Sequence, residues 1–557
     1  MNFIKNKWVK KSIISLLVGG IGSFILFYIF LPPINPRSVG FWVYLALCSV
    51  LFALPFYNIK LDVVIKQLAE ASDGQIVPPK MRVTTLKGIN KWALIPTAVC
   101  ILVIAVGLII SSTLFNARSY ADIIEVNDSV FSEDLPETSE ITNIALMDTA
   151  TATILGNRTL GSLSHVVSQY VVSNAYTQIN YKGAPRKVSN LEYDGFFKWI
   201  GNRQDGIPGM VMVDPVGNTA EYVELKNPIH YVESGFFGDD LERRLRFDYP
   251  TKIFNSISFE IDEDGNPYYI VSCSTPKVMM FGASDITEVI IFNPTNGESE
   301  LYAIGDVPKW VDIVYTGNLA TEKYNWYGTL KGGFINSIIV NRGCTLATDD
   351  FGYIVIGDDV WYFTGVTSAV SNDKSNIGFI ISNARTGEYK FYSVTGAEEH
   401  SAMNAAEGEV QEKGYVASFP SLVNIAGQPT YIMVLKDNAG LVKLYALVNV
   451  EQYSIVATGT TQAEAISSYK KLLIQGGIDS DVSEAQVTVT VSDVRLATVA
   501  GISTVYITAE DGTVYKGYLE ADEALITVRA GDVLNISYAE TQIAGIRAII
   551  KWSKVTN

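Results

Sequence analysis

The sequence predicts an α+β membrane protein with three N-terminal transmembrane helices, repeated antiparallel hairpin and helix modules, and a small C-terminal β-barrel. Three observations lead to this prediction. Apolar runs long enough to cross a bilayer occur only in the first 116 of the 557 residues. A β-rich pattern with a fixed glycine-to-tyrosine spacing then recurs four times. Short alternating strands end the chain.

The three predicted spans are runs without a charged residue, at 12–32, 41–59 and 93–115. Each has about the 17–25 residues that a transmembrane helix needs. Residues 1–116 are therefore expected to form a three-helix membrane anchor. A cleaved signal peptide followed by two helices fits less well, because the proline-rich stretch 32–36 stands where cleavage requires small residues.

Basic residues indicate the orientation of these spans. The N-terminal tail carries four lysines and the loop 60–92 carries six basic residues, whereas the turn after the first span carries only Arg37. Basic flanks stay on the cytoplasmic side. We therefore predict that the N-terminus and the loop 60–92 are cytoplasmic and that residues 116–557 are outside.

The outer region is acidic. Residues 117–557 contain 31 basic and 55 acidic side chains. Such a charge repels nucleic acid, so no nucleic-acid partner is expected. Solubility explains the charge most simply, and attraction of cations or of a basic partner is the alternative.

The four cysteines do not form a disulfide framework. Cys48 and Cys100 lie within spans, where a thiol behaves as a small apolar side chain. Cys273 and Cys344 lie outside, where a disulfide can persist. The sequence leaves open whether these two are bonded.

We divide the outer region into four parts. Residues 117–140 are expected to form an acidic tether, 141–250 a first α+β module, 251–475 a set of repeated modules, and 485–557 a small barrel. Helices are predicted at 162–174, 397–413 and 461–475.

The internal repeat is a hairpin in which a tyrosine follows a glycine by five residues. A glycine at a fixed place supplies the positive φ of a turn, and the fixed interval puts the tyrosine on one face of the return strand. The glycine–tyrosine pairs are Gly217–Tyr222, Gly297–Tyr302, Gly387–Tyr392 and Gly440–Tyr445. Two further hairpins are expected around Asp264-Gly265 and around Asp350 to Tyr353.

The hairpin with its Asn-x-x-x-Gly-Glu turn, tyrosine and following helix resembles the PepSY-type modules of bacterial envelope proteins, most clearly at 293–302 and 383–392. Lys436 and Leu441 depart from the pattern. More broadly, residues 117–475 look like an uncharacterised group of membrane-anchored proteins from Gram-positive gut bacteria, on segments such as Trp310-Val-Asp. The first resemblance implies peptide binding or protease control. The second implies the bacterial cytoplasmic membrane and brings no activity.

The C-terminal unit is predicted from strands at 486–491, 503–508 and 513–518, a Gly-Asp before an alternating strand ending at Tyr538, and the run 546–552. This pattern predicts a barrel of the OB or SH3 type. A unit poor in basic residues and outside the cell is better suited to adhesion or assembly than to nucleic-acid binding.

No catalytic constellation is recognised. The three histidines, His165, His230 and His400, are far apart, and no zinc pair, Cys-x-x-Cys, Gly-x-Ser-x-Gly or phosphate-binding loop occurs. A Ser-x-x-Lys pair needs its serine at a helix start, and Pro276 interrupts the first of the four. These pairs are Ser274–Lys277, Ser371–Lys374, Ser467–Lys470 and Ser468–Lys471.

Acidic pairs are frequent without indicating a site: Asp239-Asp240, Asp349-Asp350, Asp358-Asp359, and Asp262 with Asp264. The last resembles a calcium loop but lacks the distal glutamate, so a hairpin turn explains it better. We predict no catalytic residue, cofactor or metal ligand.

The expected function is that of a membrane-anchored binding, scaffolding or regulatory protein of the cell envelope, not an enzyme. The alternative is a self-assembling structural subunit that uses the barrel and open strand edges. An enzyme acting on cell-wall polymer comes third.

Overall fold

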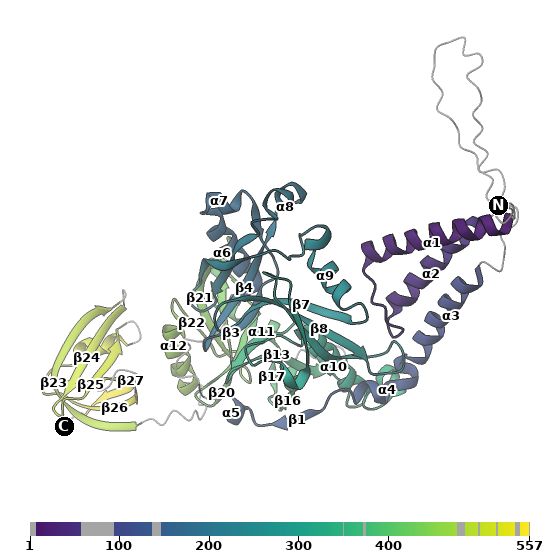
Figure 1. Cartoon of the computed structure of the whole chain (residues 1–557). Helices are drawn as coiled ribbons and strands as arrows, with labels where there is room; N and C mark the ends of the chain where they lie inside the picture. The colour runs from purple at the N-terminus through teal and green to yellow at the C-terminus, as the bar shows by residue number, and fades with distance from the viewer. Residues whose placement is uncertain are drawn as a thin grey trace, which may run out of the picture. The chain divides into compact units, whose positions relative to one another are not determined.

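The computed structural model (Figure 1) describes residues 7–56, 94–135, 137, 146–348, 350–370, 375–475, 485–499, 502–519, 522–540 and 546–555. The chain forms two compact units. The first comprises Met1–Ser129 with Thr142–Thr395, and the second comprises Val130–Ile141 with Gly396–Asn557. The predicted cytoplasmic loop 60–92 lies outside the described residues.

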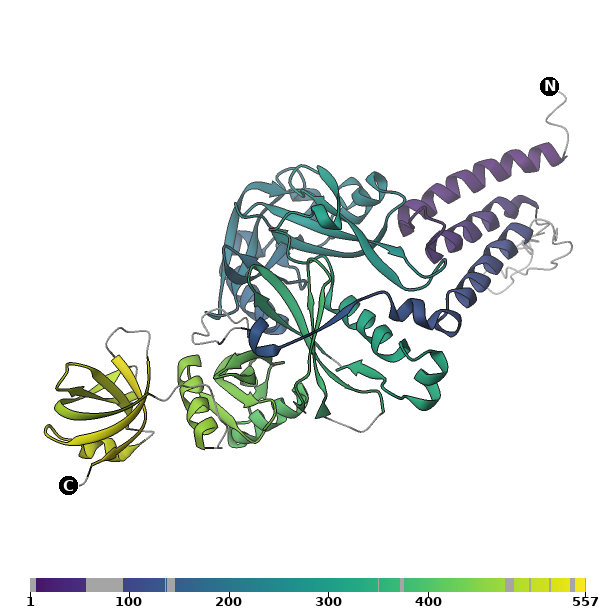
Figure 2. The same cartoon turned by 90° about the horizontal axis from the view of Figure 1, so that it is seen from below.

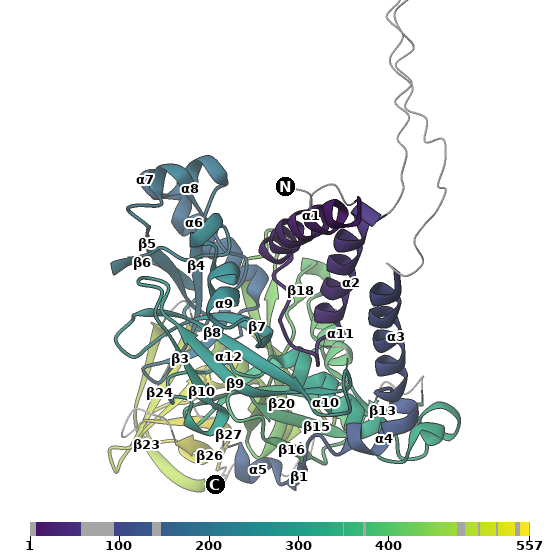
Figure 3. The ribbon, with the colours of Figure 1, turned by 45° about the vertical axis from the view of Figure 1, so that its right-hand side comes forward.

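Two helical segments are long and apolar enough to cross a membrane. They are Val9–Phe30, within α1 (Lys7–Phe30), and Val39–Phe56, which joins α2 (Val39–Ala53) to η2 (Leu54–Phe56). The third predicted run is not one straight helix. It divides into α3 (Ile95–Ile110) and α4 (Thr113–Ala121) (Figure 3). These two helices are long and apolar enough to cross a membrane only when they are taken together, and they are bent by 56° relative to each other.

The rest of the first unit contains three main sheets, whose strands are mostly antiparallel. The first sheet has the order β2-β4-β5-β6 with β3 beside β4, and the second is the meander β10-β9-β8-β7. Their strands are β2 (Tyr170–Val172), β3 (Thr177–Tyr181), β4 (Ala184–Tyr193), β5 (Ile207–Asp214), β6 (Thr219–Ile229), β7 (Ile253–Ile261), β8 (Pro267–Pro276), β9 (Ser284–Phe292) and β10 (Ser299–Ala303). Both sheets contribute to one core that includes Trp199, Val211 and Phe292.

The third sheet has the order β1-β16-β15-β13-β11, with β12 beside β13. Its strands are β1 (Val126–Ser129), β11 (Thr345–Ala347), β12 (Gly352–Ile356), β13 (Asp359–Ser368), β15 (Gly378–Asn383) and β16 (Tyr389–Tyr392). The first unit also contains α6 (Thr149–Gly161), α7 (Ser164–Val167), α8 (Phe196–Asn202), α9 (Leu241–Asp248), α10 (Gly317–Leu330), and the short helices η4 (Phe237–Asp239), η5 (Ile304–Asp306) and η6 (Asn336–Val340).

Residues predicted to be an irregular tether take part in this fold. Residues 117–121 belong to α4, and β1 pairs in parallel with β16. Phe131 and Leu135 are buried in the second unit, around α5 (Phe131–Asp134). These elements could not be predicted, because the segment is acidic and has too few apolar residues to show a helical or strand pattern.

The repeat has a structural counterpart at the second and third sheets. Gly297 and Gly387 have φ values of 77° and 73°, and each donates its N–H to the turn-opening asparagine, at 2.9 and 3.0 Å. In each turn, the ring of a tyrosine from earlier in the chain packs against the glycine: Tyr231 against Gly297, and Tyr315 against Gly387. Both tyrosine N–H groups donate to the carbonyl just after the asparagine, so the two turns are docked in the same way.

All four glycine–tyrosine hairpins form, but one differs in its turn. In the first, Asn218 rather than Gly217 adopts positive φ, at 54°. The hairpin predicted around Asp350 to Tyr353 is wrong. β11 and β12 both pair with β13, and the turn lies at Gly357, whose φ is 66°.

The helix predicted at 162–174 is also wrong for most of its length. α6 ends at Gly161, α7 is a single turn, and residues 170–172 form the strand β2. Tertiary pairing with β4 overrides the local helical preference there.

The second unit begins with a five-stranded sheet, of order β18-β20-β21-β22 with β19 beside β20. The predicted helices are confirmed as α11 (Glu399–Glu409) with η7 (Gln411–Lys413), and as α12 (Gln462–Gln475) (Figure 2). The strands are β18 (Val416–Ala417), β19 (Ser421–Ile425), β20 (Gln428–Lys436), β21 (Val442–Asn449) and β22 (Val456–Gly459).

The C-terminal strands close into a barrel of order β23-β24-β25-β27-β26, in which β25 and β27 are parallel and the other neighbours are antiparallel. The strands are β23 (Ala485–Val499), β24 (Ile502–Ala509), β25 (Val514–Tyr518), β26 (Val533–Glu540) and β27 (Ile546–Lys554). The short helix η8 (Glu523–Thr527) lies between β25 and β26 in the chain.

All four cysteines are buried free thiols. Cys273 and Cys344 are therefore not bonded to each other, and burial raises the pKa of the Cys273 thiol to about 12. The Cys273 thiol is therefore not placed for chemistry at neutral pH.

Candidate ligand-binding site

Helix α10 provides one wall of a solvent-open pocket. Thr316 caps its N-terminus by accepting the N–H of Leu319 at 3.3 Å. Leu319, Ala320, Lys323 and Tyr324 face the core. The pocket-lining residues recur at helical spacing on another face: Asn318, Thr321, Glu322, Asn325 and Trp326.

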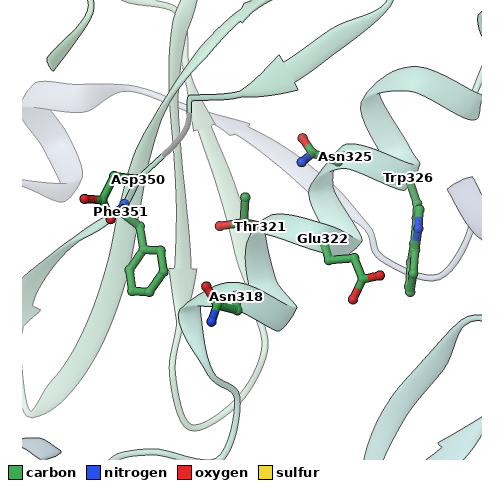
Figure 4. Close-up of a pocket in the computed structure, with 7 residues that line it drawn as sticks. All are labelled: Asn318, Thr321, Glu322, Asn325, Trp326, Asp350 and Phe351. Carbon is green, nitrogen blue, oxygen red and sulfur yellow. Dashed lines mark hydrogen bonds between the residues drawn. The ribbon is translucent and has the colours of Figure 1, made fainter. Parts of the chain in front are cut away.

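Asp350 and Phe351, just before β12, form the opposite wall of the pocket. The cavity has a volume of about 260 Å³. Figure 4 shows the Phe351 ring directed toward Asn318 and Thr321 across the opening. This approach requires Gly317, because a Cβ there would clash with the Phe351 ring.

The chemistry of the pocket favours a cation. Two exposed carboxylates, Glu322 and Asp350, flank amide and hydroxyl groups and two aromatic rings. Although Glu322 lies at the exposed rim, surrounding protein desolvates its carboxyl and raises its pKa. Trp326 is oriented by an edge-to-face contact with Tyr120 of α4, at 5.3 Å between centroids. An ammonium or guanidinium group is attracted both to carboxylates and to aromatic faces.

A buried carboxyl pair fixes the segment that leads into α10. Glu260, on β7, is 0% exposed, and its two oxygens accept the N–H groups of Asp312 and Ile313 at 2.8 and 3.0 Å. The Ser258 hydroxyl adds a third hydrogen bond, at 3.2 Å. Glu260 therefore holds the chain four residues before the N-cap of α10.

Asp312 extends this network to the first sheet. One oxygen of its carboxyl group accepts the N–H of Asn180, on β3, at 2.7 Å. The side-chain amide of Asn180 donates to Asp358 at 2.9 Å, beside the third sheet. The network thus joins all three sheets of the first unit near the base of α10.

Burial raises the pKa of both acids, and the neighbouring Glu260 carboxylate raises that of Asp312 further, to about 9. Glu260 has three donors that stabilise its charged form, whereas Asp312 has one. We therefore expect Asp312, rather than Glu260, to carry a proton at neutral pH.

The histidines and Ser-x-x-Lys pairs do not assemble into a site. His230 lies 3.4 Å from the carbonyl of Arg203, and His400 is exposed on α11. Ser274 is buried within β8, while Ser467 and Ser468 lie inside α12, where Lys470 pairs with Glu137 at 3.7 Å. The His165 side chain and the pair Ser371–Lys374 lie outside the described parts.

The acidic pairs have separate local partners. Asp239 contacts Trp199 and Arg203, and Asp240 caps α9. Asp359 pairs with Arg385.

The Asp262 carboxylate accepts hydrogen bonds from Asp264 and Asn266 within the hairpin turn, which matches the turn interpretation. Among the described residues, no three His, Cys, Asp or Glu side chains are placed to hold a metal ion.

The sequence interpretation missed Glu260, Asp312 and Glu322. Two of these acids carried a usable signal. Glu260 lies between the buried Phe259 and Ile261, and Asp312 lies between Val311 and Ile313. An acid within an apolar strand or segment is buried at a cost unless it is paired. The face from Asn318 to Trp326 also follows from helical periodicity.

Comparison with known proteins does not assign this chain to a family. No protein-family profile matches the chain, and no curated protein is similar to it in sequence. Among solved structures, a crystal structure of an ACO/RPE65 chimera has 8% identity and a TM-score of 0.12. That alignment covers 69% of this chain, which spans 62% of the chimera's length, and a score this low carries no information on fold or function.

Proposed function

We propose that this protein is a membrane-anchored, extracytoplasmic binding protein of a bacterial envelope, and that its α10 pocket takes a basic side chain or amine of a partner protein. The observation that carries this proposal is the combination of Glu322, Asp350, Trp326 and Phe351 around one solvent-open cavity. Its two carboxylates and two aromatic rings suit recognition of a cation, and no histidine, cysteine, serine or lysine among the described residues lines the cavity.

The anchor in this proposal has three spans, with α3 as the third and the outer region following it. The bend between α3 and α4 is compatible with this arrangement, because it allows α3 to cross the bilayer while α4 packs on the protein. The basic residues of the tail and of the loop 60–92 support a cytoplasmic location for both.

The barrel is proposed to be of the OB type rather than the SH3 type. Its five strands, the parallel pair β25–β27 and the short helix between β25 and β26 support this assignment. A closed barrel has no open sheet edge, so it offers no ready strand pairing for self-assembly. For the barrel, binding of a different protein is therefore favoured over strand pairing between copies of the chain.

Calorimetric titration of the full-length protein in detergent with short lysine-containing peptides tests the proposal. We expect peptide binding that acetylation of the lysine abolishes. The pair Glu322→Gln and Asp350→Asn should weaken binding by about tenfold, or ~1.4 kcal/mol. The matched control, Asp194→Asn with Glu221→Gln, removes two exposed acids elsewhere and should have no effect. Equal binding of acetylated peptides, or unaltered binding by the pocket variant, would contradict the proposal.

A further inference from the structure

An unusually apolar surface segment follows α10. Four of the six residues from 335 to 340 are large aliphatic side chains with 60–74% of their surface exposed: Ile335, Ile338, Ile339 and Val340. The segment includes η6, a single π-helical turn, which is a rare conformation that frequently occurs at functional sites. Exposed aliphatic residues gathered in this way mark a surface that contacts protein or lipid.

The segment is held in place by its own hydrogen bonds. The side chain of Asn336 accepts the N–H of Arg342 at 3.1 Å and donates to the Arg342 carbonyl at 3.0 Å. The Asn341 N–H donates to the Asn336 carbonyl at 2.7 Å, and the Ser337 N–H donates to Gly333 at 3.1 Å. These bonds fix the turn, so its aliphatic side chains are presented on a locally ordered segment.

The segment is continuous with the end of the third apolar helix. Leu330 and Phe334, which lead into it, pack against Tyr120 and Ala121 of α4. Figure 3 shows α10 beside α4, which follows directly from α3.

The loop between β8 and β9 joins the same region. Its Met280 and Phe281 N–H groups donate to the Ser111 hydroxyl, at the break between α3 and α4, at 3.2 and 3.0 Å. The Phe281 ring packs on Gly107 of α3, while Met279 is 60% exposed. Two separate apolar projections, the segment 335–340 and Met279, therefore lie next to the helix pair α3 and α4.

The charges around these projections suit a lipid headgroup layer. Lys277, Lys331 and Arg342 are exposed and flank the two apolar projections in the sequence. They stand in an outer region whose formal charge is strongly negative. Cationic residues next to apolar side chains are typical of segments that lie in a bilayer interface.

We propose that Ile335–Val340 and Met279 insert into the outer leaflet of the bilayer that the spans cross, beside α3. The occupant of this apolar surface is lipid. Insertion holds α10 at the membrane surface, so the pocket opens close to the headgroups. This inference rests on membrane anchoring and is independent of what the pocket binds.

Spin labelling tests it with the full-length protein in phosphatidylglycerol–phosphatidylcholine nanodiscs. A label is attached to Ile339→Cys in a chain whose four native cysteines are replaced by alanine, and its accessibility to oxygen and to a water-soluble nickel chelate is measured. We expect oxygen to be favoured severalfold. The control label at Leu496→Cys, a barrel residue that is 61% exposed, should favour the chelate.

Equal chelate accessibility at both sites would overturn the proposal. Shielding of Ile339 from both reagents would also overturn it, in favour of a protein–protein contact. A second measurement keeps the native cysteines. A benzophenone amino acid at position 339 should form a lipid adduct on irradiation, and an adduct with protein alone would contradict lipid insertion.

Discussion

At the scale of single residues, the buried pair of Glu260 and Asp312 makes stability depend on pH. The folded chain holds a proton on Asp312 that the unfolded chain releases near its ordinary pKa of about 3.9. The folded pKa is raised, so the favourable contribution is complete below about pH 4. It is lost as pH rises toward about 9.

The variant Asp312→Asn should remove this dependence. Asparagine retains an oxygen for the Asn180 N–H and cannot ionise. Relative to the wild type, the variant should gain up to ~1.4 kcal/mol of unfolding free energy per pH unit between neutral and alkaline pH. Chemical denaturation of the full-length protein at a series of pH values measures this. The control Asp128→Asn, at an exposed position, should keep the wild-type slope, and a parallel slope in Asp312→Asn would refute the protonated pair.

At the scale of elements, the repeated turns should be sensitive to their glycines. Gly387 has a φ of 73°, and a Cβ there would lie 2.8 Å from the Tyr315 ring that docks on the turn. Gly387→Ala should therefore cost roughly 1–3 kcal/mol through backbone strain, in addition to displacing Tyr315. Thermal unfolding of the full-length protein measures the loss. Gly201→Ala, in α8 with open space around the position, should be neutral or stabilising by up to ~1 kcal/mol, and equal effects would argue against the turn account.

Elements with a clear local signal could be predicted from the sequence. The helices α11 and α12 and the four glycine–tyrosine hairpins follow from composition and turn chemistry. The strand β2 and the joint pairing of β11 and β12 with β13 depend on tertiary neighbours that local patterns do not specify. The pocket face of α10 was predictable as a helical face, but its opposite wall at Phe351 was not, because 25 residues separate Phe351 from Trp326.

At the scale of the whole molecule, one helix of the first module and one of the repeated modules contact the N-terminal helices. On α9, Arg246 donates to the Leu31 carbonyl at 2.9 Å, just beyond the end of α1, and α10 packs on α4. Cationic groups at a helix C-terminus stabilise its unpaired carbonyls. These contacts place α9 and α10 against the N-terminal helices, which is consistent with a pocket at the membrane surface. The convergence of Asn180, Glu260 and Asp312 from distant parts of the chain could not be read from the sequence.

The central claim is that the α10 pocket lies outside the membrane and binds another envelope protein. The most direct test labels Asn318→Cys in intact cells with a membrane-impermeant maleimide that carries a photo-crosslinker. Asn318 is exposed at the pocket, whereas the native cysteines are buried. The account predicts labelling without permeabilisation and a light-dependent link to one heterologous envelope protein, which Glu322→Gln with Asp350→Asn should markedly reduce. Labelling only after permeabilisation, or links only between copies of this chain, would contradict it.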